Sequence, residues 1–209
     1  MYFPKKFFLW LGLIILGTLG YVAYKFYAGR GGGDNGPKQE AVKLKTHSDT
    51  FNMKVTTLLS DYFAMHDAFV DADTTKAKAA CKSMIAKADS FDLSELKKDT
   101  SGIYQTAYDN LENVKLNAKS LLAQTNIAEM RKDYSGVNEN LFPFLRVVNY
   151  KGTNTYWQNC PMAFGEGKEA NWISNTREIV NPYLGKNDPE FKGSMLHCGE
   201  VKDSLVSPK

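Results

Sequence analysis

The sequence predicts an all-α protein: an up-down four-helix bundle with a loop-rich C-terminal segment packed on it, preceded by one transmembrane helix. Three observations lead to this fold class. The first is an uncharged apolar stretch near the N-terminus, and the second is a set of four segments whose apolar residues recur every three or four positions. The third is a C-terminal part rich in Gly, Asn, Pro and aromatic residues, which lacks that period.

The apolar stretch from Phe7 to Tyr24 contains no charged residue, and we expect a transmembrane anchor over residues 7–27. Trp10 at one end and three tyrosines at the other suit the two membrane interfaces. A cleaved signal peptide is the alternative. Its apolar region is usually about 7–15 residues long, and its cleavage site needs small residues that Phe26-Tyr27-Ala28 does not supply.

A short N-terminus before a long C-terminal domain is typical of a signal anchor. We therefore expect residues 1–6 in the cytoplasm and the soluble domain on the far side of an inner membrane, which is the periplasm in a bacterium. The predicted localisation is single-pass in the inner membrane, and the membrane is the first predicted partner.

The basic excess of the chain belongs to the predicted anchor. The chain has 26 basic and 23 acidic residues, and the first 30 residues contain four of the basic residues and none of the acidic ones. The rest of the chain therefore contains 22 basic and 23 acidic residues. Because the soluble part has no basic field, we expect no nucleic-acid partner.

Residues 28–45 are predicted to form a flexible linker, since Gly29–Pro37 is dense in glycine and contains nothing that can pack. Residues 46–209 are predicted to form the domain. Asp73 is expected to cap the second helix, and Asn126 with Glu129 is expected to form a capping box at the fourth. The four predicted helices contain the apolar stripes Phe51–Phe69, Ala77–Ala88, Tyr104–Leu122 and Ile127–Val148.

From about residue 151 the helical period fades, and we expect loops with one short helix over Ala170–Val180. Two sulfur-rich clusters lie in this segment, one in Trp157–Met162 and the other in Met195–Glu200. Thiolates and thioethers select Cu(I) over harder metals. The clusters therefore predict a soft-metal site, with Cu(I) as its metal, whose candidate ligands are Cys160, Met162, Met195, His197 and Cys198.

Other interpretations of these residues stay open. Cys160 and Cys198 would form a disulfide in an oxidising compartment, or they would bind zinc together with His197. His66, on an apolar stripe, is expected to be a hydrogen-bonded core histidine, and Cys81 is expected to be a buried free thiol.

Signatures of catalysis are missing from the sequence. It has no Gly-x-Ser-x-Gly, His-Glu-x-x-His or complete phosphate-binding loop, because Gly165-Glu166-Gly167-Lys168 lacks the upstream glycine at the required spacing. We therefore expect no enzyme and no catalytic residue.

Several motifs resemble a family. The similar segments are Asp61–Asp73, Cys160-Pro161-Met162-Ala163, Trp172-Ile173-Ser174, Asn181–Gly185 and Met195–Val201. Together they resemble an uncharacterised bacterial cell-envelope domain of unknown function, which is also found fused to periplasmic adaptors of heavy-metal efflux pumps. The resemblance implies a soft-metal site at the sulfur clusters and a heavy-metal efflux component as a partner.

Two functional hypotheses follow. The first is a membrane-anchored periplasmic protein that binds a soft metal ion, Cu(I), in envelope metal handling or efflux. The alternative is a disulfide-stapled, non-catalytic interaction module of the cell envelope. Both depend on the same two cysteines.

Overall fold

The computed structural model describes residues 18, 20–21, 24–25 and 47–206. The chain divides into two units, Met1–Glu40 and Ala41–Lys209, and the second contains the fold discussed below. Its elements in chain order are α2 (Asp49–Val70), α3 (Thr74–Asp89), the short 3₁₀ helix η1 (Ser94–Lys98), α4 (Ile103–Ala123), α5 (Ile127–Val147), β1 (Thr155–Cys160), β2 (Ala170–Ser174) and β3 (Glu200–Leu205).

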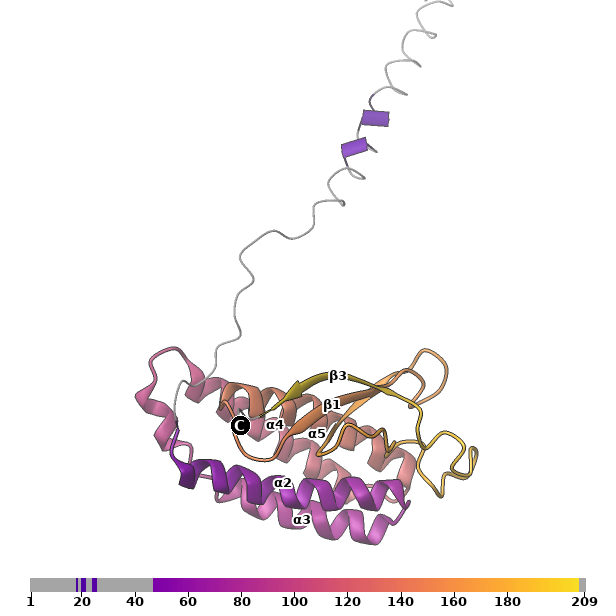
Figure 1. The fold of residues 1–209 in the computed structure, drawn as a ribbon, viewed down its shortest axis with the longest axis horizontal. Helices are drawn as coiled ribbons and strands as arrows, with labels where there is room; N and C mark the ends of the chain where they lie inside the picture. The colour runs from indigo at the N-terminus through magenta and orange to yellow at the C-terminus, as the bar shows by residue number, and fades with distance from the viewer. Residues whose placement is uncertain (1–17, 19, 22–23, 26–46, 207–209) are drawn as a thin grey trace, which may run out of the picture. The chain divides into compact units, whose positions relative to one another are not determined.

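The four predicted helices are confirmed, and local capping explains where they begin. The Asp73 side chain accepts a hydrogen bond from the Lys76 N–H at 2.9 Å, as predicted for the N-cap of α3. Asn126 accepts from the Glu129 N–H at 2.9 Å at the start of α5. Each cap satisfies an N–H that has no partner within its helix. The links from α2 to α3 and from α4 to α5 are short, the longer connection from α3 to α4 contains η1, and neighbouring helices run antiparallel (Figure 1).

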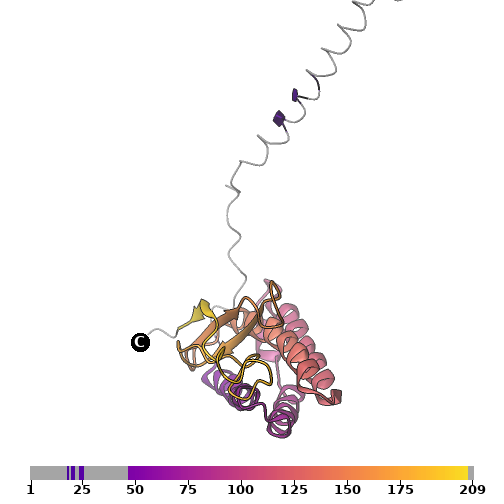
Figure 2. The ribbon, with the colours of Figure 1, turned by 90° about the vertical axis from the view of Figure 1, so that its right-hand side faces the viewer.

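The apolar stripes of the helices form the core. Figure 2 views the helices nearly end-on. The helices lie together, and the sheet and the C-terminal loops lie along one side of them. The largest fully buried side chains come from both parts: Trp172, Tyr62, Tyr134, Tyr183, Phe69 and Phe144. The C-terminal part is therefore built into the same core as the helices.

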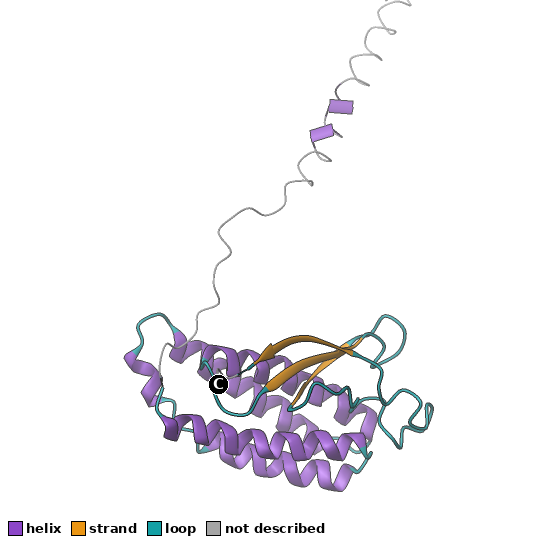
Figure 3. Ribbon diagram, in the orientation of Figure 1, coloured by secondary structure: helices purple, strands orange, loops and turns teal. Residues whose placement is uncertain are grey.

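The predicted all-α fold class is wrong, because the C-terminal part contains a three-stranded antiparallel sheet of order β2-β1-β3 (Figure 3). The predicted helix over Ala170–Val180 is wrong, because the segment forms strand β2 followed by a bend and loop. Strand β1 could not be identified as a strand from its sequence pattern, because it is covered on both faces. Its residues Gln158, Asn159 and Cys160 are all buried, so apolar and polar positions do not alternate.

Side chains from the helices close one edge of the sheet. The Tyr62 hydroxyl, from α2, accepts from the Ile173 N–H at 2.9 Å. The Asn138 amide, from α5, donates to the Asn171 carbonyl at 2.9 Å. These contacts satisfy backbone groups on the outer side of β2 that no strand pairs. They fix the sheet beside α2 and α5.

The predictions of a transmembrane helix and of a single-pass inner-membrane location with a periplasmic domain are not supported. Within the described residues, no helix is both long enough and apolar enough to span a membrane. Most of the predicted anchor (7–27), the whole predicted linker (28–45) and residues 1–6 lie outside the described residues.

Candidate functional site: a buried pair of cysteines

The sheet brings Cys160 and Cys198 together. Cys160 ends β1, and Cys198 lies two residues before β3. The antiparallel register pairs Asn159 with Glu200, so the chain ahead of β3 passes beside the end of β1. The two Sγ atoms are 2.9 Å apart.

Gly199 permits this close passage. Its φ is +145°, and a Cβ placed there would lie 2.6 Å from the Asn159 carbonyl oxygen and 2.9 Å from Cη2 of Trp172. Only a residue without a side chain fits between the strand and the indole ring. Gly199 therefore sets the distance between the segment that carries Cys198 and strand β1.

Asn181 holds the Cys198 segment from the other side. The buried Asn181 amide donates to the Cys198 carbonyl at 2.9 Å, and its backbone N–H donates to the Leu196 carbonyl at 2.8 Å. The His66 ring, from α2, contacts the neighbouring Val180 carbonyl through Nε2 at 3.1 Å. The loop before β3 is thus tied to both the sheet and the helices.

The pair lies in surroundings that disfavour charge. Cys160 is fully buried and Cys198 is partly buried, and both are free cysteines. Burial, with the adjoining Cys160 sulfur as a further cause, raises the pKa of the Cys198 thiol to about 11. Because the thiolate is the reactive form, the reduced Cys198 is a slow nucleophile near neutral pH.

The distance between the sulfurs is short for two groups without a bond. Non-bonded heavy atoms pack best at about 3.5–4.0 Å, and a disulfide is about 2.05 Å long. At 2.9 Å the two sulfurs are already closer than a non-bonded contact. The arrangement is therefore suited to forming a disulfide by a small movement of the two side chains.

The other predicted ligands occupy separate surroundings. Met162 lines a surface pocket with Phe164 and Phe191, and Met195 is partly buried against the core. The exposed His197 ring contacts the Ile179 carbonyl through Nδ1 at 2.7 Å. In the part of the chain that the structure describes, the one contact between side chains of the predicted ligand set joins Cys160 to Cys198, and the Cys198 N–H also donates to the Met195 carbonyl at 2.9 Å.

This geometry corrects the prediction of a metal centre built from histidine and cysteine. Among residues 47–206 and the few described before them, no group of three or more His, Cys, Asp or Glu side chains is arranged to hold a metal ion. A zinc site of Cys160, His197 and Cys198 is therefore wrong. The ring of His197 is instead bonded to the backbone.

Two predictions about the remaining candidates are confirmed. Cys81 is a buried free thiol that donates to the Ala118 carbonyl at 3.3 Å, and burial raises its pKa to about 12. His66 is 6% exposed and hydrogen-bonded through both ring nitrogens, as expected of a core histidine.

The structure contains a buried ion pair that was not predicted from the sequence. Arg131, in α5, donates to the Asp188 carboxylate at 3.1 Å and to the Pro182 carbonyl at 3.0 Å. The position of Arg131 in the sequence could have indicated this pair. Arg131 lies between Ile127 and Tyr134 at helical spacing, on the buried stripe of α5. A charged residue on such a stripe needs a buried partner.

By architecture, the domain is a four-helix bundle that carries a small antiparallel sheet and a cysteine pair. Residues 58–152 match the model of a family described as "Protein of unknown function (DUF3347)". The match supports similarity to a domain of unknown function, and it bears on neither cellular location nor fusion to efflux adaptors. The matched range ends before β1, so the two cysteines lie beyond it. No curated protein and no solved structure matches the chain.

Proposed function

We propose that this domain is a non-catalytic interaction module whose C-terminal part is stapled by a disulfide between Cys160 and Cys198. The observation that carries the proposal is the 2.9 Å separation of the two sulfurs. With oxidised glutathione as the oxidant, the two thiols lose two electrons and two protons, and the glutathione disulfide becomes two thiols.

The staple has a structural purpose in this fold. Between β2 and β3 the chain contains no regular helix or strand in the described residues. The bond would span 38 positions. Closing a loop of this length restricts the unfolded chain by about 4 kcal/mol. It would also fix the start of β3 against the end of β1.

Strand β3 forms one wall of a surface groove, which is the proposed binding surface. The groove has a volume of about 600 Å³ and lies between β3 and α5. Its apolar lining consists of Phe142, Pro143, Val147 and Trp157, and its charged lining of Glu139, Arg146, Lys202 and Asp203. Trp157 stacks on Phe142 with ring centroids 4.7 Å apart, which supplies the aromatic surface common in interfaces.

Selection of short random peptides on the full oxidised chain tests the proposal. We expect enriched peptides with apolar residues, whose binding falls after Trp157→Ser or Val147→Ser and after reduction. Tyr108→Ser is the matched control, because Tyr108 is an exposed aromatic residue on α4, away from the groove. Circular dichroism checks that each variant is folded. Peptides that bind the groove variants as well as the unaltered chain would contradict the proposal.

Binding of Cu(I) by the two reduced thiols is the other hypothesis from the sequence, and it stays a prediction. The short sulfur separation supports the disulfide, since two thiolates on one metal, with zinc–thiolate lengths of about 2.3 Å and tetrahedral angles taken as a guide, would lie about 3.5–4 Å apart. Competition of the reduced full chain with a chromogenic Cu(I) chelator separates the two. Competition that is lost in Cys160→Ser and kept in Cys81→Ser would favour Cu(I) binding by the two thiols.

A further inference from the structure

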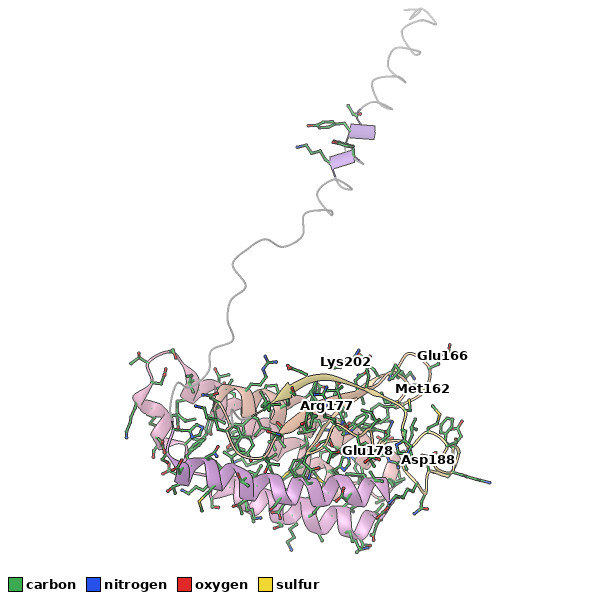
Figure 4. All side chains as sticks on the ribbon, viewed as in Figure 1. Met162, Glu166, Arg177, Glu178, Asp188 and Lys202 are labelled. Carbon is green, nitrogen blue, oxygen red and sulfur yellow. The ribbon has the colours of Figure 1, made fainter. Side chains whose placement is uncertain are left out.

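A second pocket lies where the beginning of α5 meets two C-terminal segments. Its volume is about 440 Å³. The walls come from α5 near Arg131, from the turn that follows β1, and from the segment that begins at Tyr183. Figure 4 shows Met162, Glu166 and Asp188, which all line the pocket, at the same end of the domain. The pocket is distinct from the groove between β3 and α5.

The wall of this pocket is mostly aromatic and apolar. Phe164 and Tyr183 meet edge to face with ring centroids 5.2 Å apart. Phe191 adds a third ring and Met162 a polarisable thioether, and both are partly buried. Such a surface accepts a flat apolar group, and its ring faces attract a cation.

The charges of the lining leave an excess of carboxylate. Arg131 is paired with Asp188 at 3.1 Å, both nearly buried, and Lys132 is paired with Glu129 at 2.7 Å. Two carboxylates on the rim, Glu166 and Glu190, are exposed and have no ion-pair partner within the described residues. The lining therefore presents aromatic rings and three carboxylates against two cations, and two of these carboxylates, Glu166 and Glu190, form no ion pair within the described residues.

We propose that this pocket binds a small organic cation that carries an apolar group. Its ammonium group would lie against Phe164 and Phe191 and near Glu166 and Glu190, and its apolar part against Met162. An anion fits less well. The guanidinium of Arg131 is already neutralised by Asp188, and the two rim carboxylates would repel an anion.

Equilibrium dialysis of the full chain against benzyltrimethylammonium tests the assignment. Benzoate and benzyl alcohol serve as the anionic and neutral counterparts of similar size. We expect retention of the cation only, weakened by added sodium chloride because the rim carboxylates are exposed. Benzoate retained more strongly than the cation, or no retention of the cation, would overturn the proposal.

Variants locate the site. Phe191→Leu removes one ring, and we expect the cation to bind between about twofold and thirtyfold more weakly. The double variant Glu166→Gln/Glu190→Gln should also weaken it, by about twofold to fivefold for each charge. Glu178→Gln is the matched control, because Glu178 is an exposed carboxylate outside the pocket (Figure 4). Equal weakening by Glu178→Gln would show general attraction by the protein's charge and contradict the site.

Discussion

A single glycine determines how closely the chain passes strand β1 just before β3. Gly199 lies in a backbone conformation that side chains rarely adopt, and it also faces the Asn159 carbonyl and the Trp172 ring at distances that exclude a Cβ. The short separation of the two sulfurs follows from it. The proposed disulfide therefore depends on the missing Cβ of Gly199 as well as on the two cysteines.

Gly199→Ala should destabilise the domain by more than the 1–3 kcal/mol that an unfavourable backbone conformation costs, because a steric clash is added. Urea unfolding followed by circular dichroism measures the change. Gly165→Ala is the matched control, since Gly165 has φ of +107° but nothing within 4 Å of the position its Cβ would take. Equal losses in the two variants would show that the clash contributes nothing.

The thiol of Cys198 should react slowly in the reduced protein. Its pKa of about 11 means that the thiolate fraction rises about tenfold with each pH unit until that value is reached. Alkylation by iodoacetamide, followed by mass spectrometry, should rise with the same slope. Cys160→Ser should shift the profile to lower pH, because it removes the neighbouring sulfur, although burial keeps the pKa above its usual value. A profile that levels off near pH 9 would contradict this.

At the scale of elements, the helices followed from the sequence and the strands did not. The caps at Asp73 and Asn126 act locally, so the residues that make them are adjacent in sequence. Strands β1 and β2 are covered by α5 on one side and by the C-terminal loop on the other, which removes the alternation that identifies a strand. The cysteine pair was a candidate from its sequence. The distance between their two sulfurs could not be predicted from the sequence, because it depends on the register of β1 and β3.

The buried ion pair between α5 and the C-terminal segment gives a test at this scale. Asp188→Asn leaves Arg131 buried without a counter-charge, and we expect a loss of about 3–5 kcal/mol in the free energy of unfolding. Glu129→Gln breaks the exposed pair with Lys132 and should cost less than about 1 kcal/mol. Denaturant unfolding of both variants measures the contrast. Similar losses would show that Arg131 is not isolated by burial.

At the scale of the whole domain, the similarity to a family of unknown function covers α5 and most of the helices before it, and the sheet lies outside the matched range. The two parts nevertheless share one core, because Tyr62 and Tyr134 from the helices lie near Ile173 and Tyr183 from the C-terminal part. The staple, the groove and the aromatic pocket all involve the C-terminal part. Helix α5 supplies the other wall of the groove and part of the wall of the pocket.

The staple should strengthen the domain as a unit. Oxidation of the full chain is expected to raise the free energy of unfolding by about 4 kcal/mol through loop closure. Denaturant curves of the oxidised and reduced forms measure the difference. It should persist in Cys81→Ser and vanish in Cys198→Ser, since Cys81 lies in α3, away from the pair. A difference that is the same in Cys198→Ser would mean that oxidation acts elsewhere.

The most direct test of the central claim is a peptide map of the full chain after equilibration with oxidised glutathione. The chain is alkylated without reductant, digested and analysed by mass spectrometry. We predict one linked pair of peptides that joins Cys160 to Cys198 and disappears on reduction, with Cys81 alkylated once the chain is unfolded. Alkylation of Cys160 and Cys198 as separate free thiols, without reductant, would contradict it.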